Sequence, residues 1–227
     1  MDFLAAKNEK VCLFVLKSVK KCAIIISIKC AGVKYMNQSI SWDKNKTCCF
    51  TGHRNRDLPF SGDRSRQGMK CLVSSLQLNI EKAIKDGYDT FISGMAEGVD
   101  LICAEIVYNL ISRKGMKLNL ICAVPYKGQG TKELSDPMDQ YIYSMIISDC
   151  SDVVYVSEKK DRLCYRRRNQ FMVDNSHRII GVYREKGVSS GTLQTINMAK
   201  KAGLEMSIIS LDRNPVFYIS EHSSVNI

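Results

Sequence analysis

Several short segments combine glycine with hydroxyl, amide or cationic side chains, at points where an apolar run ends and a helical pattern begins. Glycine lets the backbone approach a ligand closely, and the first N–H groups of a following helix favour a phosphate. Four such turns supply candidate ligand-binding residues: Thr51, Gly52, His53 and Arg54; Ser93, Gly94, Met95, Ala96, Gly98 and Asp100; Pro125; and Ser189, Ser190, Gly191 and Thr192. A single turn of this kind is often only a tight connection, but its recurrence favours a phosphate-bearing ligand. Neither G-x-x-x-x-G-K-[ST] nor G-x-G-x-x-G occurs, which disfavours an ordinary kinase, ATPase or nicotinamide dehydrogenase.

Three polar side chains beside these turns have two interpretations each. Only about one residue of the run Arg166–Arg168 can face a given site from a helix. We take Arg168, with Asn169, as facing the ligand because a guanidinium binds phosphate in a bidentate manner; the alternative is a solvated helix face. His53 is either a ligand contact or acid–base group, or a structural histidine. Asp100 either binds a ribose hydroxyl or complements the dipole of its helix.

Short apolar runs alternate with helical patterns from residue 46 onward. The predicted strands are 47–52, 90–93, 118–124, 152–156, 178–183 and 205–210, and helices of ten or more residues separate most of them. This alternation is typical of βαβ units and a parallel sheet. We therefore expect an α/β fold, a Rossmann-like doubly wound parallel sheet in three α/β/α layers. Ligands of such sheets bind beyond the carboxyl ends of the strands, which is where the glycine-rich turns lie.

Composition places the chain among cytoplasmic proteins without a membrane span. The net charge is +10, but residues 1–46 carry nine lysines and three acids, so the rest of the chain is only mildly basic. The apolar stretch 11–31 contains four lysines, which disfavours both a spanning helix and a signal peptide. The ten cysteines form no CxxC pair, as expected of reduced thiols in a core rather than of a metal site.

The motifs together resemble one family. They are TGHR at 51–54, SGMAEGVD at 93–100, PYKGQ at 125–129, RRNQFMVDNSHRIIGVY at 167–183 and SSGTLQT at 189–195. In order and type they are similar to the YpsA-like branch of the SLOG superfamily, which also holds the DNA-processing protein A and Lonely Guy families. The resemblance implies a Rossmann-like domain over 46–211 that binds nucleotides or their derivatives, often in a sensing role. It leaves 1–45 as an N-terminal extension and 212–227 as a C-terminal tail.

The chain departs from the patterns of these families at two of the glycine-rich turns, 93–100 and 189–192. Met95 stands where the related pattern has glycine or another small residue, and Ser189 and Ser190 stand where the family has glycine. Lonely Guy enzymes follow the last turn with two glutamates that serve hydrolysis, and here Gln194 and Thr195 occupy those places. Glutamine cannot take up a proton as a carboxylate does, so hydrolysis of that type is disfavoured.

These observations favour a nucleotide-binding sensor or regulatory domain without a catalytic residue, metal ligand or separate cofactor. Two alternatives stay open. One is a phosphoribohydrolase-like nucleotide hydrolase using Glu97, Asp100 or His53, since glycosidic hydrolysis needs carboxyl groups that flank one bond. The other is single-stranded DNA binding, as in DNA-processing protein A, by a patch around Tyr165 and its neighbouring arginines. The expected partner is a small nucleotide ligand, with nucleic acid and a homo-oligomer as further alternatives.

Overall fold

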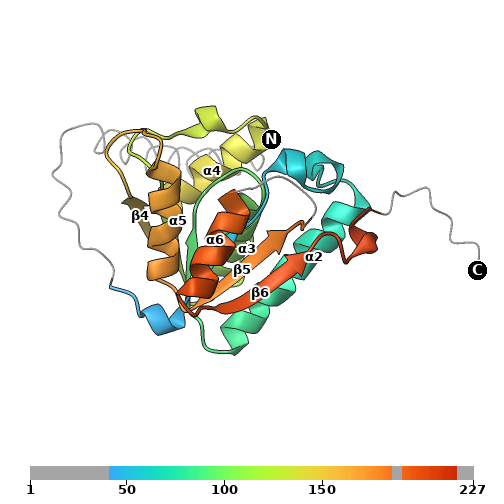
Figure 1. Cartoon of the computed structure of the whole chain (residues 1–227), viewed down its shortest axis with the longest axis horizontal. Helices are drawn as coiled ribbons and strands as arrows, with labels where there is room; N and C mark the ends of the chain where they lie inside the picture. Colours follow the sequence, from blue (N-terminus) through green and yellow to red (C-terminus); the bar gives the residue numbers. More distant parts are fainter. Residues whose placement is uncertain (1–40, 186–190, 219–227) are drawn as a thin grey trace, which may run out of the picture. The chain divides into compact units, whose positions relative to one another are not determined.

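A single parallel sheet forms the centre of the protein. The computed structural model describes residues 41–185 and 191–218. Within these ranges six strands pair in the order β4-β3-β2-β1-β5-β6, and all are parallel (Figure 1). Their bounds are β1 Thr47–Thr51, β2 Thr90–Ser93, β3 Asn119–Val124, β4 Asp152–Tyr155, β5 Arg178–Tyr183 and β6 Glu205–Ser210. The predicted Rossmann-like sheet is therefore confirmed, with strand ends that differ from the prediction by at most one residue.

Helices cover both faces of this sheet. They are α2 Gln67–Lys85, α3 Val99–Ser112, α4 Pro137–Asp149, α5 Cys164–Asp174 and α6 Gly191–Lys201. The first three pack with Cys48 and Phe50 of β1 on one face, whereas α5 and α6 pack with Cys49 on the other. Figure 1 shows α5 and α6 on the near side of the strands. Because β1 is buried on both faces, its sequence is a continuous apolar run rather than an alternating one.

The order in which the chain adds strands to the sheet reverses beside β1, and this reversal determines where the candidate site lies. The chain runs outward from β1 through β2 and β3 to β4, and then returns so that β5 pairs with the other side of β1. Loops after β1 and β5 therefore diverge at the carboxyl end of the sheet. Such a switch point is where open α/β sheets bind ligands.

The end of the chain adds to the core. Of the predicted tail, the structure describes residues up to 218, and Pro215–Tyr218 form a 3-10 helix. Phe217 in this turn is only 3% exposed and belongs to the same apolar cluster as α2. Of the predicted N-terminal extension, residues 1–40 lie outside the described residues, and a short 3-10 helix at Lys44–Lys46 leads into β1. Among the described residues, no helix has the length and apolar character that crossing a membrane requires.

We expect Phe217→Ala to lower the free energy of unfolding by about 3 kcal/mol, because it removes a large buried side chain from the core. Val216→Ala is the matched control, since Val216 is 42% exposed and its truncation should change stability by less than about 0.5 kcal/mol. Chemical denaturation of both variants measures the difference. Equal stabilities would show that residues after β6 do not support the domain.

Candidate functional site

A cavity of about 660 Å³ lies at the switch point of the sheet, and we call it the switch-point cavity. Loops and helices after β1 and β5, together with α5 and the first turn of α6, supply its walls. Ten of the predicted site residues line it: Thr51, Gly52, His53, Arg54, Ala96, Asp100, Arg168, Asn169, Gly191 and Thr192. Ser93, Gly94, Met95, Gly98 and Pro125 do not line it. Ser189 and Ser190 lie outside the described residues.

A buried ion pair forms the inner wall of this cavity. The guanidinium of Arg168 on α5 donates from NH1 to Asp100 Oδ2 on α3 at 2.8 Å, and both side chains are less than a tenth exposed. Helical register selects this arginine, because Cys164, Arg168 and Met172 share the buried face of α5. Nε of Arg168 is also buried and has no hydrogen-bond partner among the described residues. A buried donor without a partner is costly, so an acceptor entering the cavity here would be stabilising.

Gly94 makes room for this ion pair. A Cβ atom at Gly94 would lie 1.3 Å from Arg168 NH1 and 2.6 Å from Asp100 Oδ2. The guanidinium therefore occupies space that any larger residue at position 94 would fill. Gly98 lies in the same turn and is required there for two other reasons. Its φ of 89° is unfavourable for other residues, and a Cβ there would lie 2.3 Å from the carbonyl oxygen of His53.

Ser93 and Met95 shape the turn between β2 and α3. Ser93 Oγ accepts a hydrogen bond from the Met95 amide at 3.1 Å and donates one to the Asp100 carbonyl at 2.8 Å. Met95 has a φ of 52° and is fully buried. The left-handed conformation costs a non-glycine residue roughly 1–2 kcal/mol, and burying a methionine side chain is worth a similar amount, about 1.5–3 kcal/mol. Burial of the Met95 side chain therefore offsets the free-energy cost of its left-handed backbone.

His53 and Thr192 connect the end of β1 to the neighbouring elements. His53 Nε2 accepts a hydrogen bond from the Arg184 amide at 3.0 Å, and its ring stacks on Tyr183 with centroids 5.8 Å apart. Burial lowers the pKa of His53, and the charge of Arg184 acts in the same direction. The accepting Nε2 requires the neutral ring with its proton on Nδ1. Thr192 Oγ1 donates to the Gly52 carbonyl at 2.9 Å and so fixes the first turn of α6 beside β1.

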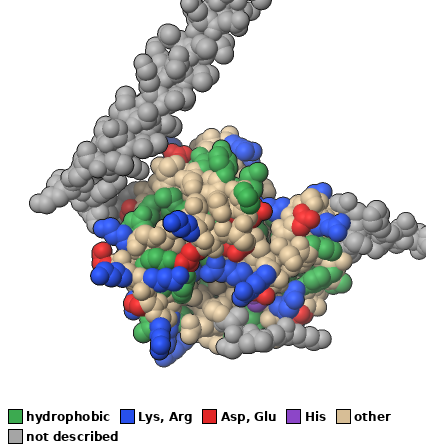
Figure 2. Space-filling view, turned by 90° about the horizontal axis from the view of Figure 1, so that it is seen from above, with side chains coloured by type: hydrophobic (Ala, Val, Ile, Leu, Met, Phe, Trp, Pro, Cys, Tyr) green, Lys and Arg blue, Asp and Glu red, His purple; other side chains and the backbone are tan. Residues whose placement is uncertain are grey.

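Positive charge predominates around the cavity. Arg54, Arg56 and Arg184 line it, and among the described residues its lining carboxylates are Asp57 and the paired Asp100. Figure 2 shows lysine and arginine side chains in a band across the middle of the face seen from above. The first turn of α6 adds the positive end of a helix dipole at Gly191 and Thr192. This arrangement suits an anionic group.

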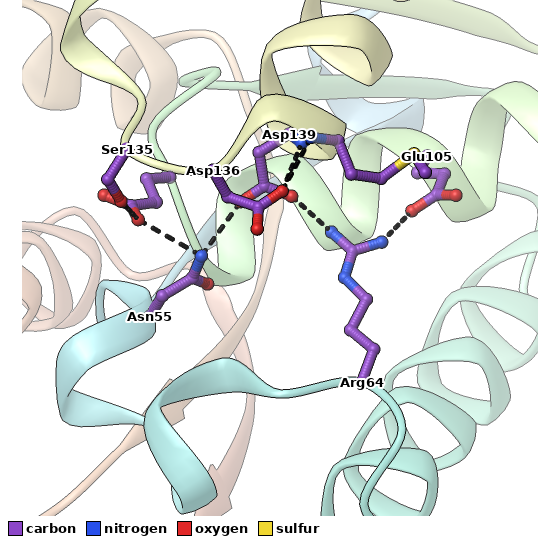
Figure 3. Close-up of polar contacts among 8 residues, drawn as sticks. Asn55, Arg64, Glu105, Ser135, Asp136 and Asp139 are labelled. Atoms are coloured by element: carbon purple, nitrogen blue, oxygen red, sulfur yellow. Dashed lines mark hydrogen bonds and ion pairs between the residues drawn. The ribbon is translucent and has the colours of Figure 1, made fainter.

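A second cavity of about 1040 Å³ adjoins the first, and the two share Arg54 and Arg56 as lining residues. We call it the loop cavity, because the loop 54–65 forms one wall and Glu97 with residues 135–139 forms the other. Asn55 Nδ2 donates to Glu97 Oε1 at 3.2 Å and to Asp139 Oδ2 at 2.9 Å (Figure 3). Glu97, considered above as a partner of Asp100 in hydrolysis, thus lines a different cavity from Asp100.

Arg64 and Asp139 hold the loop cavity together. Arg64 reaches from the loop and donates to Asp139 Oδ1 on α4 at 3.1 Å and to Glu105 on α3 (Figure 3). Asp139 is only 4% exposed, and burial raises the pKa of its carboxyl against the opposing effects of Asn55 and Arg64. This network was not predicted from the sequence. Its one available signal was Asp139 itself, a carboxylate that shares the apolar face of α4 with Ile142 and Ile146.

We expect Gly94→Ala to lower the free energy of unfolding by about 3 kcal/mol, because the new methyl group displaces the Arg168 guanidinium and leaves Asp100 buried without its partner. Gly130→Ala is the control, since a Cβ there meets nothing within 4 Å and its φ is −132°. Equilibrium unfolding in urea measures both. A Gly94→Ala protein as stable as the control would contradict the steric role of Gly94.

We expect the ring of His53 to titrate below the ordinary histidine pKa of about 6.5. The neutral ring then contributes stability that is fully present above pH 6.5 and is lost as the pH falls through the folded pKa. Chemical shifts of the ring, followed by NMR from pH 8 to 5, give this pKa directly, and the His53→Gln variant assigns the signal. A value above 6.5 would mean that His53 is held as a cation instead.

Comparison with known proteins identifies the family of this chain. The model of the YspA SLOG family matches residues 48–214. A UPF0398 protein of Bacillus thuringiensis (strain Al Hakam) is 24% identical over 160 residues, which cover 70% of this chain and 84% of that protein. UPF0398 proteins of Bacillus cereus strains Q1 and AH820 match with the same identity and coverage. The predicted resemblance is confirmed, and because the family model matches most of the chain, this protein belongs to the YspA SLOG family.

Proposed function

We propose that this protein binds a nucleotide or a nucleotide-derived phosphate ligand in the switch-point cavity and acts as a sensor or regulatory domain. The observation that carries the proposal is the meeting of the α6 N-terminus with the buried, incompletely paired guanidinium of Arg168 in one cavity. A helix N-terminus offers unpaired N–H groups and a positive dipole end to a phosphate. Nε of Arg168 on α5 offers a further N–H donor to the same cavity.

The charge balance of the cavity supports an anionic ligand. Asp100 neutralises Arg168, which leaves Arg54, Arg56 and Arg184 against the single carboxylate of Asp57. Nε of Arg184 is also buried without a hydrogen-bond partner among the described residues. Phosphate oxygens accept hydrogen bonds from guanidinium groups in a fixed planar geometry, so a phosphate would satisfy both the charge and the unused donors.

The hydrolase alternative has less support from the site. Asp100 is held by Arg168, and Glu97 lines the loop cavity rather than the switch-point cavity. The two carboxyl groups therefore do not flank one bond, as glycosidic hydrolysis requires. His53 uses Nε2 to accept the Arg184 amide, which leaves only the protonated nitrogen for a ligand.

The DNA-binding alternative also has less support. Tyr165 donates its hydroxyl to Glu133 at 2.5 Å, and Arg167 pairs with Asp161. Binding of a single strand uses several aromatic side chains along a basic groove, and Tyr165 is the one Phe, Tyr or Trp among the described residues that line the switch-point cavity. A small ligand fits these contacts better than a strand.

The test is thermal unfolding against nucleoside mono- and diphosphates, ADP-ribose and NAD. A ligand at about 100 times its dissociation constant adds about 2.7 kcal/mol to the apparent stability, which raises Tm by roughly 5–10 °C in a domain of this size. Arg184→Gln should weaken binding by about tenfold or more, because it removes a charged hydrogen-bond donor.

Arg213→Gln is the matched control for this experiment. Arg213 is 76% exposed, pairs with Glu185 and does not line the cavity, so its variant should bind as the unaltered protein does. The proposal fails if no compound raises Tm in the well-folded protein. It also fails if Arg184→Gln and Arg213→Gln respond alike to a ligand that binds.

A further inference from the structure

We propose that the loop cavity holds the ribose of the same nucleotide, with Glu97 accepting hydrogen bonds from its hydroxyl groups. This inference rests on the proposed function, because it assumes that the phosphates lie in the switch-point cavity. The inference orients the ligand along the carboxyl end of the sheet, with its phosphates in the switch-point cavity and its ribose in the loop cavity. It also assigns the ligand class, a ribonucleotide rather than a simple phosphate or a deoxynucleotide.

The two cavities are placed to hold two parts of one molecule. They share Arg54 and Arg56 as lining residues, so they lie side by side, and a ligand that extends past these two side chains would reach both. The switch-point cavity lies between β1 and β5, and the loop cavity follows the ends of β1, β2 and β3. Volumes of about 660 and 1040 Å³ compare with the ~300–1,000 Å³ of ordinary small-molecule sites.

Glu97 is held in one orientation with one oxygen left to accept. Its Oε1 receives hydrogen bonds from Asn55 Nδ2 at 3.2 Å and from Ser135 Oγ at 2.7 Å. Its Oε2 receives none from the described residues, although Glu97 lines the cavity. Carboxylates that bind ribose in Rossmann-like folds accept hydrogen bonds from the sugar hydroxyls. An oriented carboxylate oxygen without a donor is suited to the same contact here.

Asn55 and Arg64 are positioning residues for this wall. Both N–H groups of Asn55 are used, one on Glu97 and one on Asp139, so they fix the distance between α4 and the turn before α3. Arg64 neutralises Asp139 and ties the loop to α3 and α4 (Figure 3). The wall is therefore rigid without a ligand, and Glu97 does not need to move to accept one.

Charge sets which end of the ligand enters which cavity. Of the described residues, four carboxylates line the loop cavity against three arginines: Asp63, Glu97, Asp136 and Asp139 against Arg54, Arg56 and Arg64. A phosphate beside Glu97 and Asp136 would face like charges. The switch-point cavity has the opposite balance, with the α6 N-terminus among its walls. Phosphates therefore belong at the switch point, and neutral hydroxyl groups that donate hydrogen bonds belong beside Glu97.

The backbone of the outer wall supports a built site. Phe60 and Ser61 have φ values of 50° and 53°, and both line the loop cavity. Such conformations are unfavourable for residues other than glycine, and they persist where the surroundings enforce them. The Arg66 guanidinium lies 5.4 Å from the centre of the Phe60 ring and helps to hold the loop in this form.

The test compares three probes by calorimetry: ADP, 2′,3′-dideoxy-ADP and pyrophosphate. The unaltered protein should bind ADP about tenfold more tightly than dideoxy-ADP, as expected for the loss of hydrogen bonds to a charged acceptor. In Glu97→Gln this preference should fall to less than about threefold, because an amide nitrogen donates where the carboxylate accepts. Pyrophosphate should bind both proteins equally.

Glu158→Gln is the control, since it makes the same change of charge at an exposed position outside both cavities. Equal affinities for ADP and dideoxy-ADP in the unaltered protein overturn the inference, and this comparison needs no variant to fold. An unchanged preference in a folded Glu97→Gln protein overturns it as well. If pyrophosphate binds and ADP binds no more tightly, only the inference fails. If neither pyrophosphate nor ADP binds, the proposed function fails and the inference with it.

Discussion

The ion pair between Arg168 and Asp100 is the constraint around which the site is built. Arg168 comes from a helix on one face of the sheet and Asp100 from a helix on the other, so their contact joins the two outer layers across the ends of the strands. Removing one partner of such a pair leaves a buried charge, at a cost of about 3–5 kcal/mol. The absence of a side chain at Gly94 follows from the need to accommodate this contact.

The two cavities differ in charge although they share a boundary. Among the described residues, four arginines and a helix N-terminus outweigh two carboxylates in the switch-point cavity, whereas in the loop cavity four carboxylates outweigh three arginines. Burial raises the pKa of Asp139 in the loop cavity and lowers that of His53 in the switch-point cavity, so in each case burial favours the neutral form. Asn55 and Arg64 compensate Asp139, whereas His53 stays neutral and accepts an amide hydrogen bond. Both cavities are thus polar. The hydrogen bond of His53 is made to the protein backbone.

The fold was predictable because it depends on local patterns, and much of the site was not. Apolar runs and helical spacing predicted every strand of the described residues. Helical register limited the three consecutive arginines to about one that faces the site, and in the structure Arg168 is the one on the buried face of α5. The pattern at Gly94 suggested close approach to a phosphate, but the group that approaches is Arg168. The network around Asn55 joins residues 75 to 84 positions apart. Periodicity carries no information on contacts of this range, so Asn55 and Arg64 could not be recognised from the sequence.

The position of β1 has a consequence for synthesis on the ribosome. β1 is buried along its whole length, yet one of its two neighbours, β5, lies about 130 residues later in the chain. At translation rates of 5–20 residues per second, β1 waits roughly 6–25 s with one edge unpaired. Exposed apolar strand edges are the surfaces through which nascent chains aggregate. The strand order that creates the switch point therefore also creates an interval in which the growing chain keeps one edge of β1 unpaired.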